Sequence, residues 1–233
     1  MADKSGSLEE YRSKREFSRT PEPDGSQGAP KARASGRVFC VQQHLASHLH
    51  YDFRLEHRGV LLSWAVPKGP SLNPRNKRLA MMTEDHPIDY GDFEGVIPEG
   101  YGMGVVMLWD RGEWVPMHDD LDEAIERGQI KFELRGVKLK GQWALVRTAG
   151  GKYSSPRGDR AWLLIKHRDK WAGEVDVLSA APLSVSTSRD MGGILLDEMP
   201  KEWLSPQTDA ELKTKVPKQL KTLIERIKGQ AKR

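Results

Sequence analysis

The chain has 233 residues, of which 37% are hydrophobic and 30% are charged, a composition typical of a soluble protein with one ordinary core and flexible ends. No stretch approaches the roughly 18 apolar residues of a membrane helix, and the first residues contain no apolar secretory-signal segment, so we expect a cytoplasmic protein with no membrane partner. The single cysteine, Cys40, excludes an internal disulfide and a multi-cysteine metal site. Its apolar neighbours predict a buried hydrophobic residue and not a nucleophile.

The net charge of +4 is unevenly distributed along the chain. Residues 1–37 contribute eight Lys/Arg and six Asp/Glu, or +2, and residues 201–233 contribute nine and four, or +5. The remaining residues, 38–200, therefore sum to −3. A protein that held duplex DNA through its overall charge would have a more basic centre than this. Contacts with nucleic acid are therefore expected from local clusters and from the two tails.

The first predicted element is a short helix. Residues 8–17 have a helical composition, with Leu8, Tyr11 and Arg15 spaced to share one face, so we predict an N-terminal helical arm at 1–17. The stretch that follows is rich in Pro, Gly and Ser and lacks large apolar residues. It predicts a flexible linker at 18–37.

The centre of the sequence, residues 38–175, consists of many short strand-like segments separated by Gly, Pro, Asn and Asp. The clearest is LHYDFRLEH at 49–57, where apolar and polar residues alternate so that one face is apolar and the other polar. Many short strands of this kind predict a mainly β fold, a closed or nearly closed antiparallel β-barrel with a few peripheral helices. We predict that residues 38–175 form this barrel domain. Five tryptophans in strand contexts are expected in its core or at its rim: Trp64, Trp109, Trp114, Trp143 and Trp162.

Helical signals interrupt and follow the strands. The segment DDLDEAIERGQ has acidic residues in its first turn and Gly128 where a helix would end. Residues 176–233 are predicted to form an irregular segment and a basic tail that is helix-prone after Pro217. The tail fits a solvated surface helix, a contact with phosphate groups or a docking helix for a partner.

The densest group of chemically active residues lies in HLASHLHYDFRLEH. Strand alternation places His48, His50, Asp52 and Arg54 on one side. Imidazole and carboxylate groups suit a divalent ion such as Mn²⁺, Zn²⁺ or Fe²⁺, and the arginine would bind an anion such as phosphate beside it. The same pattern also fits the exposed face of a half-buried strand. In a straight strand His44 would lie about 20 Å from His50, so it can share a metal only if HLASH bends.

A second polar cluster follows in the segment from Lys68 to Tyr90. Together the strings QQHLASHLHYDFRLEHRGVLLSWAVPKGPSLNP, KRLAMMTEDHPIDYGDFEGVIPEGYG and WLLIKHRDKWA closely resemble the 3′-phosphoesterase module of bacterial DNA ligase D. That module also occurs as a free-standing protein, and we expect the free-standing form here. The resemblance covers residues 8–175.

The resemblance implies a set of functional residues. It implies that Mn²⁺, or another divalent ion such as Zn²⁺ or Co²⁺, binds to His44, His50 and Asp52, with His48 as a neighbour only. It implies phosphate binding by Arg54, Arg78 and His86, and further roles in activity for Lys68, Glu84 and Tyr90. The N-terminal KREFSRTPEP resembles the arm of the family, so Arg15, Glu16 and Glu22 match residues that support the diesterase step. Glu16 replaces the usual aspartate of the family, and Glu10 stands where some members have histidine.

The activity implied by the resemblance has two steps on a DNA or DNA/RNA primer–template. A 3′-terminal ribonucleoside is removed first, and the remaining 3′-phosphate is then hydrolysed to a 3′-OH for repair by non-homologous end joining. The implied partners are 3′ ends of nucleic acid, a DNA ligase and Ku-type end-joining factors, at the nucleoid. Two alternatives remain open. One is an Fe(II) oxygenase with ligands His50, Asp52 and His86; the other is a non-catalytic scaffold that binds DNA ends.

Overall fold

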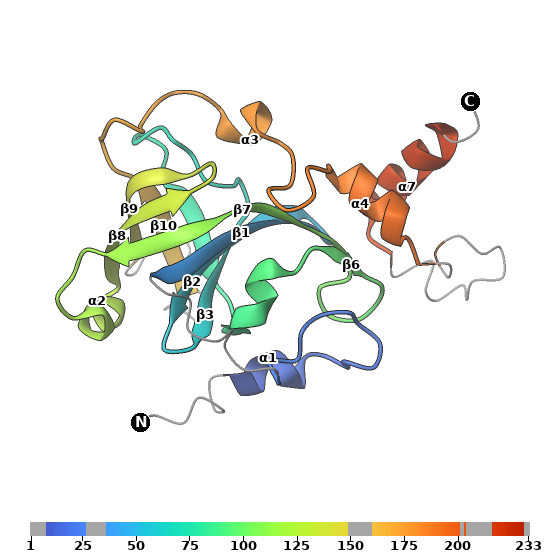
Figure 1. Ribbon diagram of the computed structural model, residues 1–233, viewed down its shortest axis with the longest axis horizontal. Coiled ribbons are helices and arrows are strands. Elements are labelled where there is room, and N and C mark those ends of the chain that lie inside the picture. Colours follow the sequence, from blue (N-terminus) through green and yellow to red (C-terminus); the bar gives the residue numbers. More distant parts are fainter. Residues whose placement is uncertain (1–7, 27–35, 149–159, 201–202, 204–215, 231–233) are drawn as a thin grey trace.

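A computed structural model describes residues 8–26, 36–148, 160–200, 203 and 216–230, with side chains to residue 226 (Figure 1). The strands are β1 (Arg37–Leu45), β2 (Leu49–His57), β3 (Val60–Val66), β4 (Arg78–Met82), β5 (His86–Pro87), β6 (Gly95–Ile97), β7 (Gly104–Pro116), β8 (Gln129–Gly136), β9 (Lys140–Arg147) and β10 (Ala161–Lys166). All pairings are antiparallel, in the order β1-β2-β3-β4-β10-β9-β8-β7, and the pairing of β7 with β1 closes the ring. β5 and β6 add to β3 and β7 outside it. The predicted mainly β fold with a closed barrel is confirmed.

Alternation along the strands separates the inside of the barrel from its outer wall. Tyr51, Phe53 and Leu55 of β2 lie in the main hydrophobic core, whereas Asp52 and Arg54 point to the opposite face. The five tryptophans predicted for the core or rim are all fully buried: Trp64, Trp109, Trp114, Trp143 and Trp162. The polar face of β2 is therefore on the outside of the barrel.

The outer wall of β1 and β3 is covered by helix η2 (Ile88–Asp92) and by the N-terminal segment with α1 (Glu9–Ser13) (Figure 1). A small second cluster of apolar residues holds this cover in place: Tyr11, Leu61, Ile88 and Tyr90. Cys40 is fully buried, as predicted, and burial raises the pKa of its thiol to about 12. On the polar face of β2, Asp52 and Arg54 are therefore buried, whereas His50 is partly exposed.

The remaining helices are α2 (Leu121–Arg127), α3 (Val177–Ala180), α4 (Met191–Glu198) and α7 (Lys218–Gln230). α2 begins where Asp120 accepts a hydrogen bond from the Glu123 N–H and ends at Gly128, which is left-handed with φ 73°. This agrees with the sequence signals. α7 follows Pro217 as predicted and packs against α4 (Figure 1). Among the described residues, no helix combines the length and apolar character needed to cross a membrane.

The boundaries expected at the two ends differ from the structure. Residues 18–26, predicted to begin a linker, lie against the barrel, and Glu22 is only 5% exposed. The sequence rule failed here because ion pairs and hydrogen bonds hold this stretch, such as that from Arg15 Nε to Glu22 at 2.9 Å, and not large apolar side chains. The rest of the predicted linker, 27–35, lies outside the described residues. In the segment predicted to be irregular, α3 and α4 are short helices.

Close packing of β7 against β8 gives a test of the barrel. A Cβ atom at Gly112 would lie 2.3 Å from the Arg135 carbonyl oxygen and 2.7 Å from the Gly136 Cα. Both atoms belong to the backbone and cannot rotate away. We expect Gly112→Ala to lower the free energy of unfolding by about 2 kcal/mol or more, measured by urea denaturation.

The matched control is Gly173→Ala, because no heavy atom lies within 4 Å of a Cβ built there. This variant should change the free energy of unfolding by less than about 0.5 kcal/mol. Equal effects of the two substitutions would contradict the described strand packing.

Candidate metal and phosphate site

The β1–β2 hairpin brings two histidines together. His44 and His50 are directly paired across the hairpin, and their ring centroids are 4.8 Å apart. Residues 46–48 form the turn between the two strands, so HLASH bends, as a shared metal site with His44 requires. His48 lies in this turn and is exposed. The distance of about 20 Å expected for a straight strand does not apply, because cross-strand neighbours lie about 5 Å apart.

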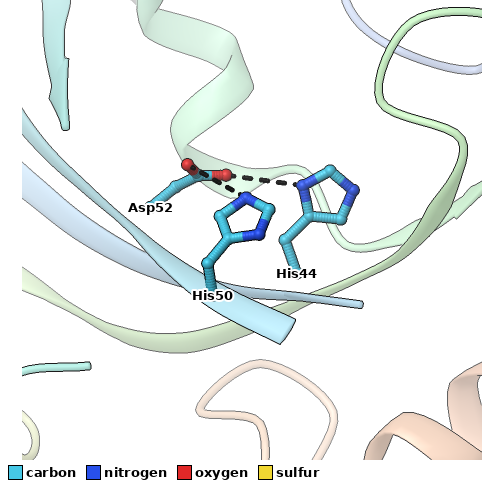
Figure 2. Close-up of side chains that lie close together, drawn as sticks. All are labelled: His44, His50 and Asp52. Carbon is cyan, nitrogen blue, oxygen red and sulfur yellow. Dashed lines mark ion pairs between the residues drawn. The ribbon is translucent and has the colours of Figure 1, made fainter. Parts of the chain in front are cut away.

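Asp52 completes a group of three side chains that could hold a metal ion (Figure 2). One ligand atom from each of His44, His50 and Asp52 can be chosen so that all lie within 4.8 Å of one another. The Asp52 carboxylate oxygens are 3.6 Å from His44 Nδ1 and 3.6 Å from His50 Nε2. Ligand atoms about 2.1 Å from one ion lie roughly 3 to 3.5 Å apart, so this spacing fits a shared divalent cation.

In both rings, the nitrogen that points away from Asp52 (the outer nitrogen) contacts a backbone carbonyl oxygen, and this determines that the lone pair lies on the other, inner nitrogen. His44 Nε2 lies 2.8 Å from the Gly102 carbonyl oxygen, and His50 Nδ1 lies 2.9 Å from the His48 carbonyl oxygen. A carbonyl oxygen only accepts, so each of these nitrogens carries a proton in the neutral ring. The inner nitrogens then present lone pairs toward Asp52. Three acceptors without a proton between them form a site suited to a metal ion, with backbone carbonyls as the second layer of support.

Arg54 keeps Asp52 ionised. Burial alone would raise the pKa of Asp52, but the Arg54 guanidinium, with Nη2 3.2 Å from the carboxylate, together with His44 and His50 lowers the pKa far below its usual range. Arg54 is itself oriented by Gln42, which accepts from Nε at 2.7 Å, and by Ser63, which accepts from Nη1 at 2.8 Å. Gln42 in turn donates to the Tyr90 carbonyl at 2.9 Å. The guanidinium is therefore held rigidly, only 2% exposed, beside the metal-binding group.

The N-terminal segment adds a second guanidinium from a distant part of the chain. Arg15 donates from Nε to Glu22 at 2.9 Å and from Nη1 to Glu84 at 3.3 Å. Tyr90 donates its hydroxyl to Glu22 at 3.0 Å, and Lys14 donates to Glu84 at 2.9 Å. These contacts tie the arm to the wall of the site.

His86 is a neutral imidazole beside both arginines. Its Nδ1 lies 2.9 Å from the Glu84 carbonyl oxygen and donates to it, so the Nε2 lone pair faces Arg15 Nη2 at 3.4 Å. Burial, and then the charges of Arg54 and Arg15, lower the pKa of His86 well below its ordinary value. In the free protein, Nε2 of this neutral ring can therefore accept a proton but has none to deliver.

These residues line one cavity of about 270 Å³. Nine of the residues predicted from the sequence take part in its lining: Arg15, Glu22, His44, His50, Asp52, Arg54, Glu84, His86 and Tyr90. Two cationic and three carboxylate side chains meet there with three histidines. The arrangement can hold a metal ion and an anion side by side.

Three predicted residues lie elsewhere. Glu16 is exposed, pairs with Arg19 at 3.5 Å and lines a neighbouring cavity. Lys68 is exposed in the turn after β3. Arg78 begins β4 and shares the face of Ala80 and Met82, which pack in the barrel core, so it points inward and not toward the outer wall. The roles implied for these three residues remain predictions.

Other lining or supporting residues were not predicted. Gln42 and Ser63 lie on strands beside Arg54, and their role becomes visible only when the strand register is known. Tyr101 lines both this cavity and its neighbour, and Lys14 lines the neighbouring cavity and donates to Glu84. The sequence feature that could have identified Lys14 was its position next to Arg15 in the arm motif.

Comparison with known proteins agrees with this geometry. Residues 42–147 match the family described as the DNA Ligase D 3′-phosphoesterase domain. The chain is 50% identical over 190 residues to the multifunctional non-homologous end joining protein LigD of Pseudomonas aeruginosa, an alignment that covers 79% of this chain. The chain belongs to the DNA ligase D 3′-phosphoesterase family. The resemblance found in the sequence is thereby confirmed.

Relatives of this phosphoesterase domain from other bacteria are also much longer proteins. LigD of Mycobacterium tuberculosis (strain H37Rv) is 43% identical over 153 residues, or 64% of this chain, and LigD of Mycolicibacterium smegmatis is 41% identical over 163 residues, or 67%. The alignments cover 22%, 19% and 21% of the three relatives. The chain therefore spans about a fifth of the length of the curated relatives that it matches.

Removal of one of the three side chains that could hold a metal ion should strongly weaken metal binding. We expect His50→Ala to weaken Mn²⁺ binding by more than about 100-fold in isothermal titration calorimetry, because two ligands remain of three. His48→Ala is the matched control, since it removes a histidine from the same hairpin whose side chain points to solvent. The described site is wrong if the two variants bind Mn²⁺ equally well.

The protonation state of His86 can be measured by nuclear magnetic resonance. We expect His86 to stay neutral at pH 6.5, where an ordinary histidine is half protonated. Arg15→Gln should raise its pKa because one depressing charge is lost, whereas Arg19→Gln, in an exposed part of the arm, should leave it unchanged. The folded state binds a proton at His86 more weakly than the unfolded state does, so this residue should lower the free energy of unfolding as the pH falls below about 6.5. An imidazole that titrates normally would contradict the assigned contacts.

Proposed function

We propose that this chain is a metal-dependent phosphoesterase that heals 3′ ends of nucleic acid. Its substrate would be a DNA or DNA/RNA primer strand on a template, in repair by non-homologous end joining. In the first step a 3′-terminal ribonucleoside leaves and a 3′-phosphate remains; in the second step that phosphate is released and a 3′-OH remains. Mn²⁺ is the proposed ion, and a DNA ligase and Ku-type factors are the proposed partners.

The observation that carries this proposal is the charge of the cavity. Arg15, Arg54 and the adjoining Lys14 balance the carboxylates of Glu22, Asp52 and Glu84. A divalent ion on the three metal-binding side chains would leave an excess of +2. That excess matches a phosphate monoester dianion, and the planar guanidinium groups match its oxygens.

Each proposed step is a hydrolysis at phosphorus. The oxygen of water forms a bond to phosphorus while the bond from phosphorus to the leaving oxygen breaks, and that oxygen takes up a proton. The leaving oxygen is O5′ of the terminal ribonucleoside in the first step and O3′ of the shortened strand in the second. A bound divalent ion would supply charge neutralisation and a more acidic water.

The protein groups have separate roles in this proposal. Arg54 and Arg15 would hold the phosphoryl oxygens and stabilise the charge that develops on them. A bound phosphate dianion would also offset the two charges that lower the pKa of His86. His86 could then hold a proton on Nε2 and deliver it to the leaving oxygen. Asp52 would stay ionised throughout because Arg54 pairs with it.

The test uses a 5′-labelled primer–template that ends in one ribonucleotide, incubated with Mn²⁺. We expect a 3′-phosphate intermediate followed by a 3′-OH product on a sequencing gel. His50→Ala should slow both steps by at least about 100-fold, and His48→Ala should stay within about 2-fold of the unmodified protein. No product with Mn²⁺, Mg²⁺ or Zn²⁺ would sink the proposal and leave a scaffold that binds ends.

The Fe(II) oxygenase alternative is not favoured. It requires His86 as the third ligand, but the group of metal-binding side chains contains His44 in its place. The Nε2 atom of His86 faces the cationic Arg15 instead. An oxygenase would also leave two buried arginines without a role. Oxygen consumption with Fe²⁺ would be its positive evidence.

A further inference from the structure

A second cavity of about 330 Å³ adjoins the metal cavity. The two share three lining residues: Arg15, Glu22 and Tyr101. Its charged lining consists of three cations and three carboxylates: Lys14, Arg15, Arg19, Glu16, Glu22 and Glu99. With equal charges, this cavity does not suit an anion. It suits an uncharged polar group that can donate hydrogen bonds to carboxylates, such as the hydroxyl groups of a ribose.

Tyr101 stands at the boundary between the two cavities. It is 51% exposed, although a large aromatic side chain gains free energy when its ring is covered. Its turn is flanked by Gly100 and Gly102, both in the left-handed region with φ +80° and +81°. The Gly102 carbonyl oxygen is the acceptor for His44 Nε2 at 2.8 Å. Tyr101 therefore directly precedes the residue whose carbonyl oxygen orients His44, one of the three side chains of the candidate metal site.

Two cations keep this ring in position. Lys14 Nζ lies 4.9 Å and Arg15 Cζ lies 5.5 Å from the centroid of the Tyr101 ring. Lys14 is itself paired with Glu84, and Arg15 with Glu22, so both cations are anchored. A fixed, half-exposed aromatic ring beside a phosphate-sized cavity has the properties of a stacking platform for a nucleobase.

We propose that Tyr101 stacks on the base of the 3′-terminal nucleoside and that the second cavity receives this neutral nucleoside while its phosphate lies in the metal cavity. This inference rests on the proposed function and adds a binding subsite to it. Stacking needs a π-face and not a particular base, so the subsite would accept all bases. Tyr101 is a positioning residue in this proposal and takes no part in proton transfer.

The test measures the coupling between the ring and the base. Fluorescence anisotropy gives the Kd for a primer–template whose last phosphodiester is replaced by a methylene phosphonate that cannot be hydrolysed. Its terminal ribose carries either a base or a hydrogen. We expect Tyr101→Ala to weaken binding of the complete end about 10-fold and that of the baseless end less than about 2-fold. Tyr101→Phe should bind both ends as the unmodified protein does.

Controls separate this subsite from a structural role and from the proposed function. Tyr101→Ala should bind Mn²⁺ with unchanged affinity, because the Gly102 carbonyl and not the ring contacts His44. Equal weakening for both ends, or no weakening, would overturn the stacking proposal even if the primer–template is processed. Coupling without any processing of a normal substrate would instead uphold the subsite and overturn the proposed function.

Discussion

The pairing of His44 with His50 across the β1–β2 hairpin is the contact on which the rest of the site depends. It places two imidazoles side by side and also pairs Gln42 with Asp52. Arg54, two residues after Asp52, can then donate to the side-chain oxygen of Gln42. A slip of one residue would turn every one of these side chains to the other face. The apolar face of β2 resists such a slip because Phe53 and Leu55 would leave the core. The hydrophobic core of the barrel thus specifies the geometry of a polar site on its outer wall.

The second constraint is the burial of several charges in one place. Arg15 and Arg54 are almost wholly buried, and each meets carboxylates and neutral acceptors that satisfy it. Removal of one partner from such a buried pair typically costs about 3 to 5 kcal/mol, since the other charge is left uncompensated. The N-terminal segment is therefore part of the site and not an appendage, because Arg15 and Glu22 satisfy groups contributed by the barrel.

Sequence reasoning predicted the barrel and the polar face of β2, because a period of two along one strand is a local signal. The position of His44 could not follow from that period, since it depends on the pairing of two strands. The turn at residues 46–48 brings His44 opposite His50, and only the register of β1 against β2 shows it. The position of Glu22 against the barrel was missed because ion pairs and hydrogen bonds with distant residues leave no periodic signal. Family resemblance placed Arg78 with the phosphate-binding residues, whereas strand alternation turns it to the barrel interior.

In the proposed function, a metal ion and a phosphate share one cavity on the outer wall of the barrel. The most direct test is anomalous diffraction at the manganese absorption edge, from crystals grown with Mn²⁺ and a primer that ends in a 3′-phosphate. We expect one strong peak within about 2.3 Å of His44 Nδ1, His50 Nε2 and an Asp52 oxygen, with the phosphate between that ion and the two arginines. A peak that involves His86 as a ligand, or an ion bound away from the hairpin, would contradict it.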